Sequence, residues 1–169
     1  MKRLTLFLLS GFLLAAGLTA DAGMERSDTK ESLRGLNGVY VAVQIIDEQP
    51  EGITTNSVET LVKSALTDAA IPVNASPKKF NGDANLSVTV DTIKQPQLDA
   101  YVFMVEVVVT QDVRLARDPH APWTSAETWR RSLQGITSPD RTDVIQQALK
   151  QTLNRFIADY RAVNPRPAN

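Results

Sequence analysis

His120 is the only histidine in the chain, and the sequence contains no cysteine. Hydrolysis by a serine nucleophile needs an imidazole as general base, and the Gly-x-Ser-x-Gly turn that presents such a serine is missing from the sequence. A catalytic zinc ion needs three ligands from histidine, cysteine or carboxylate side chains. The sequence also lacks the glycine-rich spacings that cradle phosphates. We therefore predict no catalytic residue, no metal and no cofactor, and we expect His120 to be an exposed loop residue.

Glu106 is the one charged residue within an apolar segment, residues 101–109. A pair of carboxylates can hydrolyse a glycosidic bond, so a hydrolase that acts on an envelope polymer through Glu106 is one alternative. Charged residues on a strand also pair with opposite charges on the neighbouring strand. We therefore expect Glu106 on the outer side of a sheet, facing water or paired with an arginine such as Arg130.

The residues best suited to contact a partner lie in and just after a loop with two prolines, residues 117–125. Tryptophan is costly to expose, and aromatic anchors on loops are common in protein recognition. Two alternatives stay open: Trp123 can fold back to cap the open end of the core, and Arg131 can lie over an aromatic ring. The predicted contact residues are Arg117, His120, Trp123, Trp129 and Arg131.

The first 22 residues predict an export signal. Lys2 and Arg3 precede an apolar run, residues 4–18, and Ala20-Asp21-Ala22 offers small residues at the positions a signal peptidase reads. We expect a Sec-type signal peptide at 1–22, cleaved after Ala22, and a periplasmic or secreted protein. The apolar run is shorter than the roughly 20 residues that span a membrane. Without a cysteine a lipid anchor is excluded too, so we expect no stable membrane anchor.

Charge gives no reason to expect a nucleic-acid partner. Lysine and arginine number 18 against 19 acidic residues, for a net charge of −1. A nucleic-acid-binding protein usually carries a basic field over one face. The expected partner is instead a protein or another component of the cell envelope, and the oligomeric state stays open.

Periodicity predicts a single domain at residues 38–165. A helical stripe of apolar residues runs from Val58 to Ala69. All four residues at 54–57 offer side-chain oxygens for an N-cap, and Asn56 and Glu59 have the spacing of a capping box. A second helix is expected to start at Ser138-Pro139 and to stop at Asn164-Pro165. Strands are predicted at 38–46, 84–93, 101–116 and 126–136.

The order of these elements, β-α-β-β-β-α, predicts an α+β fold. Three consecutive strands with short connections favour an antiparallel meander, and each helix has one apolar face to bury. We expect a two-layer sandwich with a mostly antiparallel four-stranded sheet and two helices on one face. The first strand could be central or at an edge. Residues 23–37 are predicted as a flexible spacer or a weak helical turn, and residues 166–169 as a tail.

An apolar pocket between helices and sheet is a second possibility, which would make the protein a binder of small ligands. We expect core packing for all four candidate lining residues, because large apolar side chains on inward faces usually fill the core. These residues are Tyr40, Phe103, Trp129 and Tyr160.

The export signal and the element order together resemble small exported bacterial domains, such as the amino-terminal domain of TolB and the LptE-type assembly proteins. The chain is also similar to an uncharacterised exported family, through the strand residue Trp129 and the helix ending Phe156-x-x-x-Tyr160-x-x-x-Asn164-Pro165. The likeness covers most of residues 38–165. LptE-type proteins are lipidated, whereas this chain lacks the cysteine. The resemblance implies a role in assembly or scaffolding, so we expect a soluble, exported, non-enzymatic protein that binds an envelope partner.

Overall fold

The computed structural model describes residues 29–47, 50–76, 83–118 and 120–165. The predicted signal peptide at 1–22, the first part of the predicted spacer and the predicted tail at 166–169 lie outside the described residues. Within these ranges, no helix is both long enough and apolar enough to cross a membrane.

The body of the protein is a five-stranded mixed sheet with the strand order β2-β1-β3-β4-β5. β3, β4 and β5 form the predicted antiparallel meander, whereas β1 runs parallel to β3 and to β2. The expected four-stranded, mostly antiparallel sheet is thus corrected to five strands with a parallel half. The strands are β1 Gly38–Asp47, β2 Val73–Asn74, β3 Asp83–Gln95, β4 Ala100–Val113 and β5 Thr124–Thr137.

The parallel pairing of β1 and β3 follows from the connection between them. That connection contains the helix α1, Thr55–Asp68, which returns the chain to the end of the sheet where β1 began. A crossover of this kind makes the two strands parallel. β2 pairs with β1 through only two residues, and its presence places β1 inside the sheet instead of at its edge.

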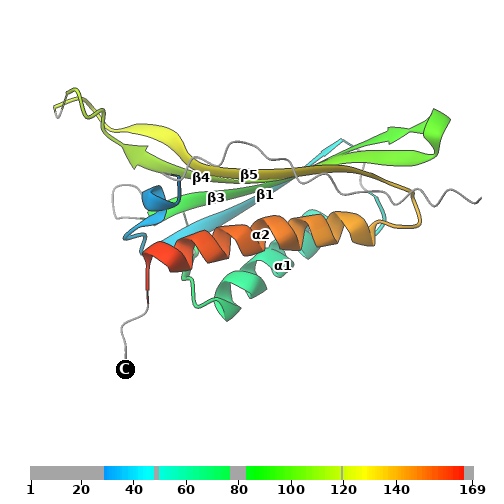
Figure 1. Cartoon of the computed structure of the whole chain (residues 1–169), viewed down its shortest axis with the longest axis horizontal. Helices are drawn as coiled ribbons and strands as arrows, with labels where there is room; N and C mark the ends of the chain where they lie inside the picture. Colours follow the sequence, from blue (N-terminus) through cyan, green and yellow to red (C-terminus); the bar gives the residue numbers. More distant parts are fainter. Residues whose placement is uncertain (1–28, 48–49, 77–82, 119, 166–169) are drawn as a thin grey trace, which may run out of the picture.

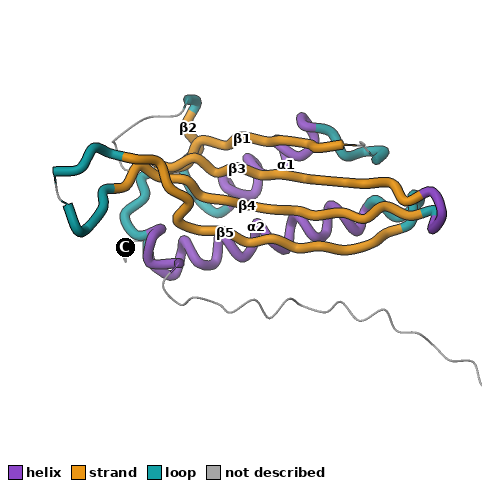
Figure 2. Tube along the Cα trace, turned by 90° about the horizontal axis from the view of Figure 1, so that it is seen from above, coloured by secondary structure: helices purple, strands orange, loops and turns teal. Residues whose placement is uncertain are grey.

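Both helices cover the same face of the sheet, as expected (Figure 1). α1 packs against β1, and the second helix α2, Asp143–Val163, packs against β4 and β5. Figure 2 shows that the long strands of the meander run nearly along the axis of α2. Alternate residues of the strands point into the space between sheet and helices, so that Val88 and Val105 are buried, and Phe156 of α2 is buried from the helix side. The protein is therefore an α+β sandwich whose second sheet face carries no helix among the described residues.

The structure shows where each helix begins. Thr54, in extended conformation and one of the four expected cap candidates, caps α1 through a capping box with Ser57, and not through the expected pair Asn56 and Glu59. The predicted start of α2 at Ser138 is also wrong, because Ser138 begins a turn that the N–H of Arg141 closes on its carbonyl at 3.0 Å. This turn carries the chain from the sheet layer to the helix layer before α2 starts.

A segment before β1 is docked onto the end of this sandwich, and we call it the strap, residues 29–37. It contains a 3-10 helix, η1, Thr29–Leu33, and both Leu33 and Leu36 are buried in the core. The hydroxyl of Tyr160 donates to the carbonyl of Leu36 at 3.0 Å. The segment predicted as a spacer or a weak helical turn is thus part of the domain from Thr29 onward.

Asn164, the residue that caps α2, binds the strap through both polar atoms of its side-chain amide. Its amide nitrogen donates to the carbonyl of Leu33 at 2.8 Å, and its amide oxygen accepts the N–H of Gly35 at 2.7 Å. Gly35 has a φ of +74°, a left-handed conformation that suits glycine. The pattern that ends at Asn164-Pro165 therefore has a structural role, which is to fix the strap to the helix.

Candidate functional site

The connection between β4 and β5 extends beyond the body of the protein (Figure 1), and we call its residues 114–118 and 120–123 the arm. Two turns shape it: the N–H of Asp118 donates to the carbonyl of Leu115, and the N–H of Ala121 donates to that of Asp118. The carboxylate of Asp118 also accepts the N–H of His120 at 3.0 Å. Hydrogen bonds within the arm thus help to define its shape.

Trp123 stands at the base of the arm with 46% of its surface exposed. The guanidinium of Arg114, on the opposite side of the hairpin, lies over its ring at 4.5 Å from the centroid. A cation over an aromatic face at an exposed site contributes about 0.5–1 kcal/mol. The ring does not belong to the core cluster, so it does not close the open end of the core. Arg114 instead holds an apolar ring in place at the surface.

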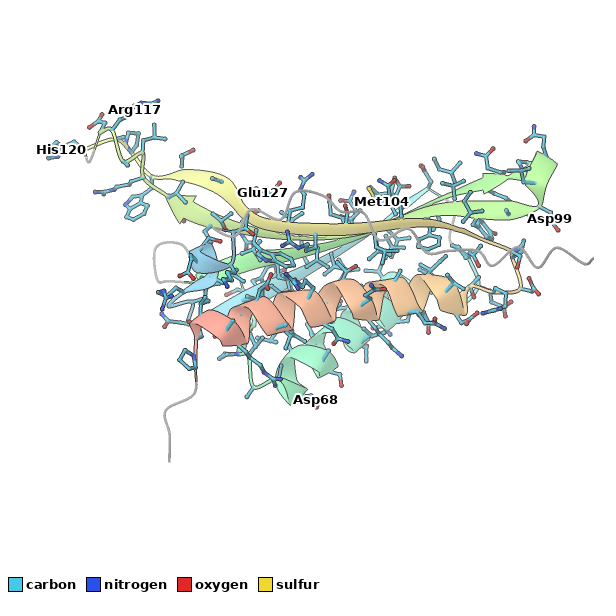
Figure 3. The ribbon with its side chains drawn as sticks, viewed as in Figure 1. Asp68, Asp99, Met104, Arg117, His120 and Glu127 are labelled. Atoms are coloured by element: carbon cyan, nitrogen blue, oxygen red, sulfur yellow. The ribbon has the colours of Figure 1, made fainter. Side chains whose placement is uncertain are left out.

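Arg117 and His120 lie at the tip of the arm, where Figure 3 shows them far from both helices. Both side chains are exposed, and Leu115 between the tip and the base is exposed as well. The arm thus presents apolar, cationic and imidazole groups on one short hairpin. Across residues 29–47, 50–76, 83–118 and 120–165, no group of three or more His, Cys, Asp or Glu side chains is arranged to hold a metal ion.

Trp129, the second predicted tryptophan contact, lies in the core with 1% of its surface exposed. Its indole N–H donates to the carboxylate of Asp159 on α2 at 3.0 Å. Its ring packs edge-on against Phe156, with centroids 5.4 Å apart. The structure does not bring Trp129 together with the arm tip, and its burial leaves it no surface to offer a partner.

Arg131 lies with its guanidinium 5.6 Å from the centre of the Trp129 ring, which confirms the interpretation that it lies over an aromatic ring. The same guanidinium is 4.0 Å from the carboxylate of Asp159, and Arg155 approaches that carboxylate at 3.5 Å. Asp159 is 7% exposed. Two arginines and an indole therefore balance one buried carboxylate, as buried charges require.

Sequence reasoning missed Asp159, although a signal for it exists. The residue falls on the apolar stripe of α2, three positions after Phe156 and next to Tyr160. A carboxylate in such a stripe indicates a buried partner with a hydrogen to donate. The strap was missed for a different reason, because its two core leucines stand within a polar segment and show no sustained period.

Glu106 lies on the outer face of β4 and pairs with Arg130 on β5 at 3.3 Å. This confirms the expected pairing of Glu106 with that arginine. The guanidinium of Arg130 also binds Glu127 at 2.6 Å, so one cation bridges two carboxylates. The arrangement offsets part of the charge of the two carboxylates on the outer surface of the sheet.

The four residues that could line an apolar pocket do not surround one space. Phe103, Trp129 and Tyr160 are buried members of the core cluster. Tyr40 alternates with the buried Val39 and Val41 on β1, so its side chain lies on the other face of the sheet.

No protein-family model matches the chain, and no curated protein matches it. The geometry of the arm is therefore the feature that best supports a function.

Proposed function

We propose that the protein is an exported, non-enzymatic binding protein that attaches to a protein partner of the cell envelope through the arm. The observation that carries this proposal is the half-exposed ring of Trp123 under the guanidinium of Arg114. Tryptophan and arginine are the residue types most enriched among those that dominate binding energy. The predicted signal peptide at 1–22 supports export.

The arm is suited to binding because its shape exists before a partner arrives. Its two turns are closed by its own main chain, and Arg114 restrains the tryptophan ring. A preorganised contact surface loses less conformational freedom on association, so more of the contact energy contributes to affinity. The element order on which the resemblance to exported assembly domains rests is also consistent with a binding role.

Site-specific photo-crosslinking in the native host tests this function. A photoreactive residue at position 120, on the arm tip, should give a discrete adduct with one envelope protein. The matched control is the same residue at position 68, because Asp68 is exposed at the end of α1, away from the arm (Figure 3). Absence of an adduct from position 120, or the same adduct from both positions, would contradict the proposal.

A further inference from the structure

β5 is the outermost strand on one side of the sheet, and only half of its free edge is protected. The carbonyl of Thr128 accepts a hydrogen bond from the hydroxyl of Ser32 in the strap at 2.9 Å. The carbonyl of Arg130 accepts one from the guanidinium of Arg131 at 3.0 Å. The main-chain groups of every second residue point to the same side of a strand. The carbonyls of Thr128 and Arg130 are two residues apart, so both point to the free edge. Side chains thus cover the edge near the arm.

The alternation continues along β5 to Ser132, Gln134 and Ile136, whose main-chain groups face the same open side. Within the described part of the chain, no strand lies beyond them. Proteins usually protect an exposed edge with charges, proline or bulges. Residues 132–137, Ser-Leu-Gln-Gly-Ile-Thr, contain neither a charge nor a proline, and the one register shift between β4 and β5 lies at Val109/Thr110.

An apolar row on the uncovered face of the sheet ends at this unprotected edge. Ile93 on β3, Val102 on β4 and Ile136 on β5 are cross-strand partners in register. Their exposed fractions are 48%, 38% and 64%, so the residue at the edge is the most exposed of the three. A strand added to β5 would place a side chain beside Ile136 and extend the row.

The length of the open edge decides which occupant fits. Five residues of strand span only about 16 Å, and two such edges paired together bury far less than the roughly 1,600 Å² typical of a stable interface between folded proteins. A second copy of the chain is therefore a poor occupant. An extended peptide can bind a short edge, because it gains main-chain hydrogen bonds and side-chain contacts together.

We infer that residues 132–136 of β5 accept an extended segment of a partner protein as an additional strand. On the outer face, the segment carries an apolar residue beside Ile136. On the helix side, it faces Leu133 and Gly135, and the ring of Phe103 lies over Gly135. Arg130 and Arg131 lie at the arm end of the open edge, and both already pair with carboxylates of this chain. The match therefore rests on the main-chain groups of the edge and on Ile136.

A synthetic peptide tests this inference against the full-length protein. The probe is acetyl-Asp-Val-Thr-Val-Thr-Val-Asp-amide, whose residue order is the same in both directions, so that either strand direction is allowed. Amide exchange measured by NMR should slow at Ser132, Gln134 and Ile136 on binding, and not at Arg131 or Leu133, which already face β4. The same peptide with alternate main-chain nitrogens methylated should lose binding.

Two variants make the result specific. Ile136→Lys, at an exposed position, should weaken binding of the peptide about tenfold or more. Leu98→Lys is the matched control, because Leu98 is also exposed and apolar but lies in the β3–β4 connection, off the edge. Gln134→Pro removes an outward N–H and should fold normally, since proline is tolerated at such an edge position, yet it should not bind.

The inference is overturned if the peptide does not bind saturably, if it protects β1 instead, or if Ile136→Lys binds as well as the wild type. It is also overturned if the three amides become protected with rising protein concentration alone, because the occupant is then a second copy. All these variants leave the arm unchanged, so failure here is distinguishable from failure of the proposed function.

Discussion

The indole N–H of Trp129 and the carboxylate of Asp159 form a buried hydrogen bond of 3.0 Å that joins β5 to α2. Trp129 is six residues after Trp123 on the same hairpin. The register shift between β4 and β5 falls beside it, where the hairpin leaves the body of the sheet. The bond therefore fixes the base from which the arm extends.

Asp159→Ala should destabilise the protein by about 3 kcal/mol, because it leaves a buried indole N–H and two arginines without their carboxylate. Asp159→Asn keeps an acceptor for the indole and should cost about half as much. Urea denaturation followed by tryptophan fluorescence measures both. Gln151→Ala, an exposed change on the same helix, is the control and should be close to neutral. An equal effect of Asp159→Ala and Gln151→Ala would refute the role of this bond.

Gly135→Ala should destabilise the protein by about 1–3 kcal/mol through overpacking. A Cβ at position 135 would lie 2.7 Å from the ring of Phe103, its cross-strand partner. That ring is buried, so any shift that relieves the clash disturbs the packing around it. In a double-mutant cycle, Phe103→Leu should remove most of the added cost. Additive effects of the two changes would show that this contact is not the cause.

Ala70→Gly should stabilise the protein by about 0.5–1 kcal/mol. Ala70 has a φ of +55° after the C-terminus of α1, a left-handed conformation that penalises a residue with a Cβ. The N–H groups of Ala70 and Ile71 bond to the carbonyls of Thr67 and Leu66, the pattern of a Schellman motif that glycine normally completes. Thermal unfolding measures the gain, and a lower melting temperature would contradict the prediction.

Stability should fall at alkaline pH partly through Tyr160. Burial raises the pKa of the Tyr160 phenol above its ordinary value of 10.0. The folded state then holds this proton more tightly than the unfolded state, so the contribution is complete below about pH 10 and is lost as pH rises through the folded-state pKa. Tyr160→Phe should lower stability at neutral pH, because the carbonyl of Leu36 loses its donor, and should flatten the alkaline fall. An unchanged alkaline slope in Tyr160→Phe would exclude this group as a source.

Periodicity in the sequence predicts most of the architecture, because each long strand and helix carries its own apolar pattern. The meander of β3, β4 and β5 and the stop of α2 at Asn164 follow from such local signals. β2 does not, since two residues have no period. The direction of β1 relative to β3 is also set by the crossover through α1. The apolar pattern of β1 itself is the same for either direction, so it does not predict the parallel pairing.

The candidate site was predictable as a region but not residue by residue. Two tryptophans six residues apart have opposite positions: Trp123 is exposed under Arg114, and Trp129 is buried against Asp159. The difference depends on α2, which contacts Trp129 through Asp159 and Phe156 and ends before the arm (Figure 1). The burial of Trp129 is decided by its contact with Asp159, 30 positions later in the chain, and a local sequence pattern does not predict which residues make such a contact.

The central claim is that Trp123 on the arm binds the partner, and the most direct measurement compares Trp123→Ala with the wild type for capture of the protein crosslinked from position 120. Trp123→Ala should reduce capture about tenfold or more, whereas Leu98→Ala, another exposed apolar residue, should not. The melting temperature should change little, since the exposed stacking with Arg114 contributes only about 0.5–1 kcal/mol. Undiminished capture by Trp123→Ala, or a large drop in its melting temperature with capture intact, would contradict the account.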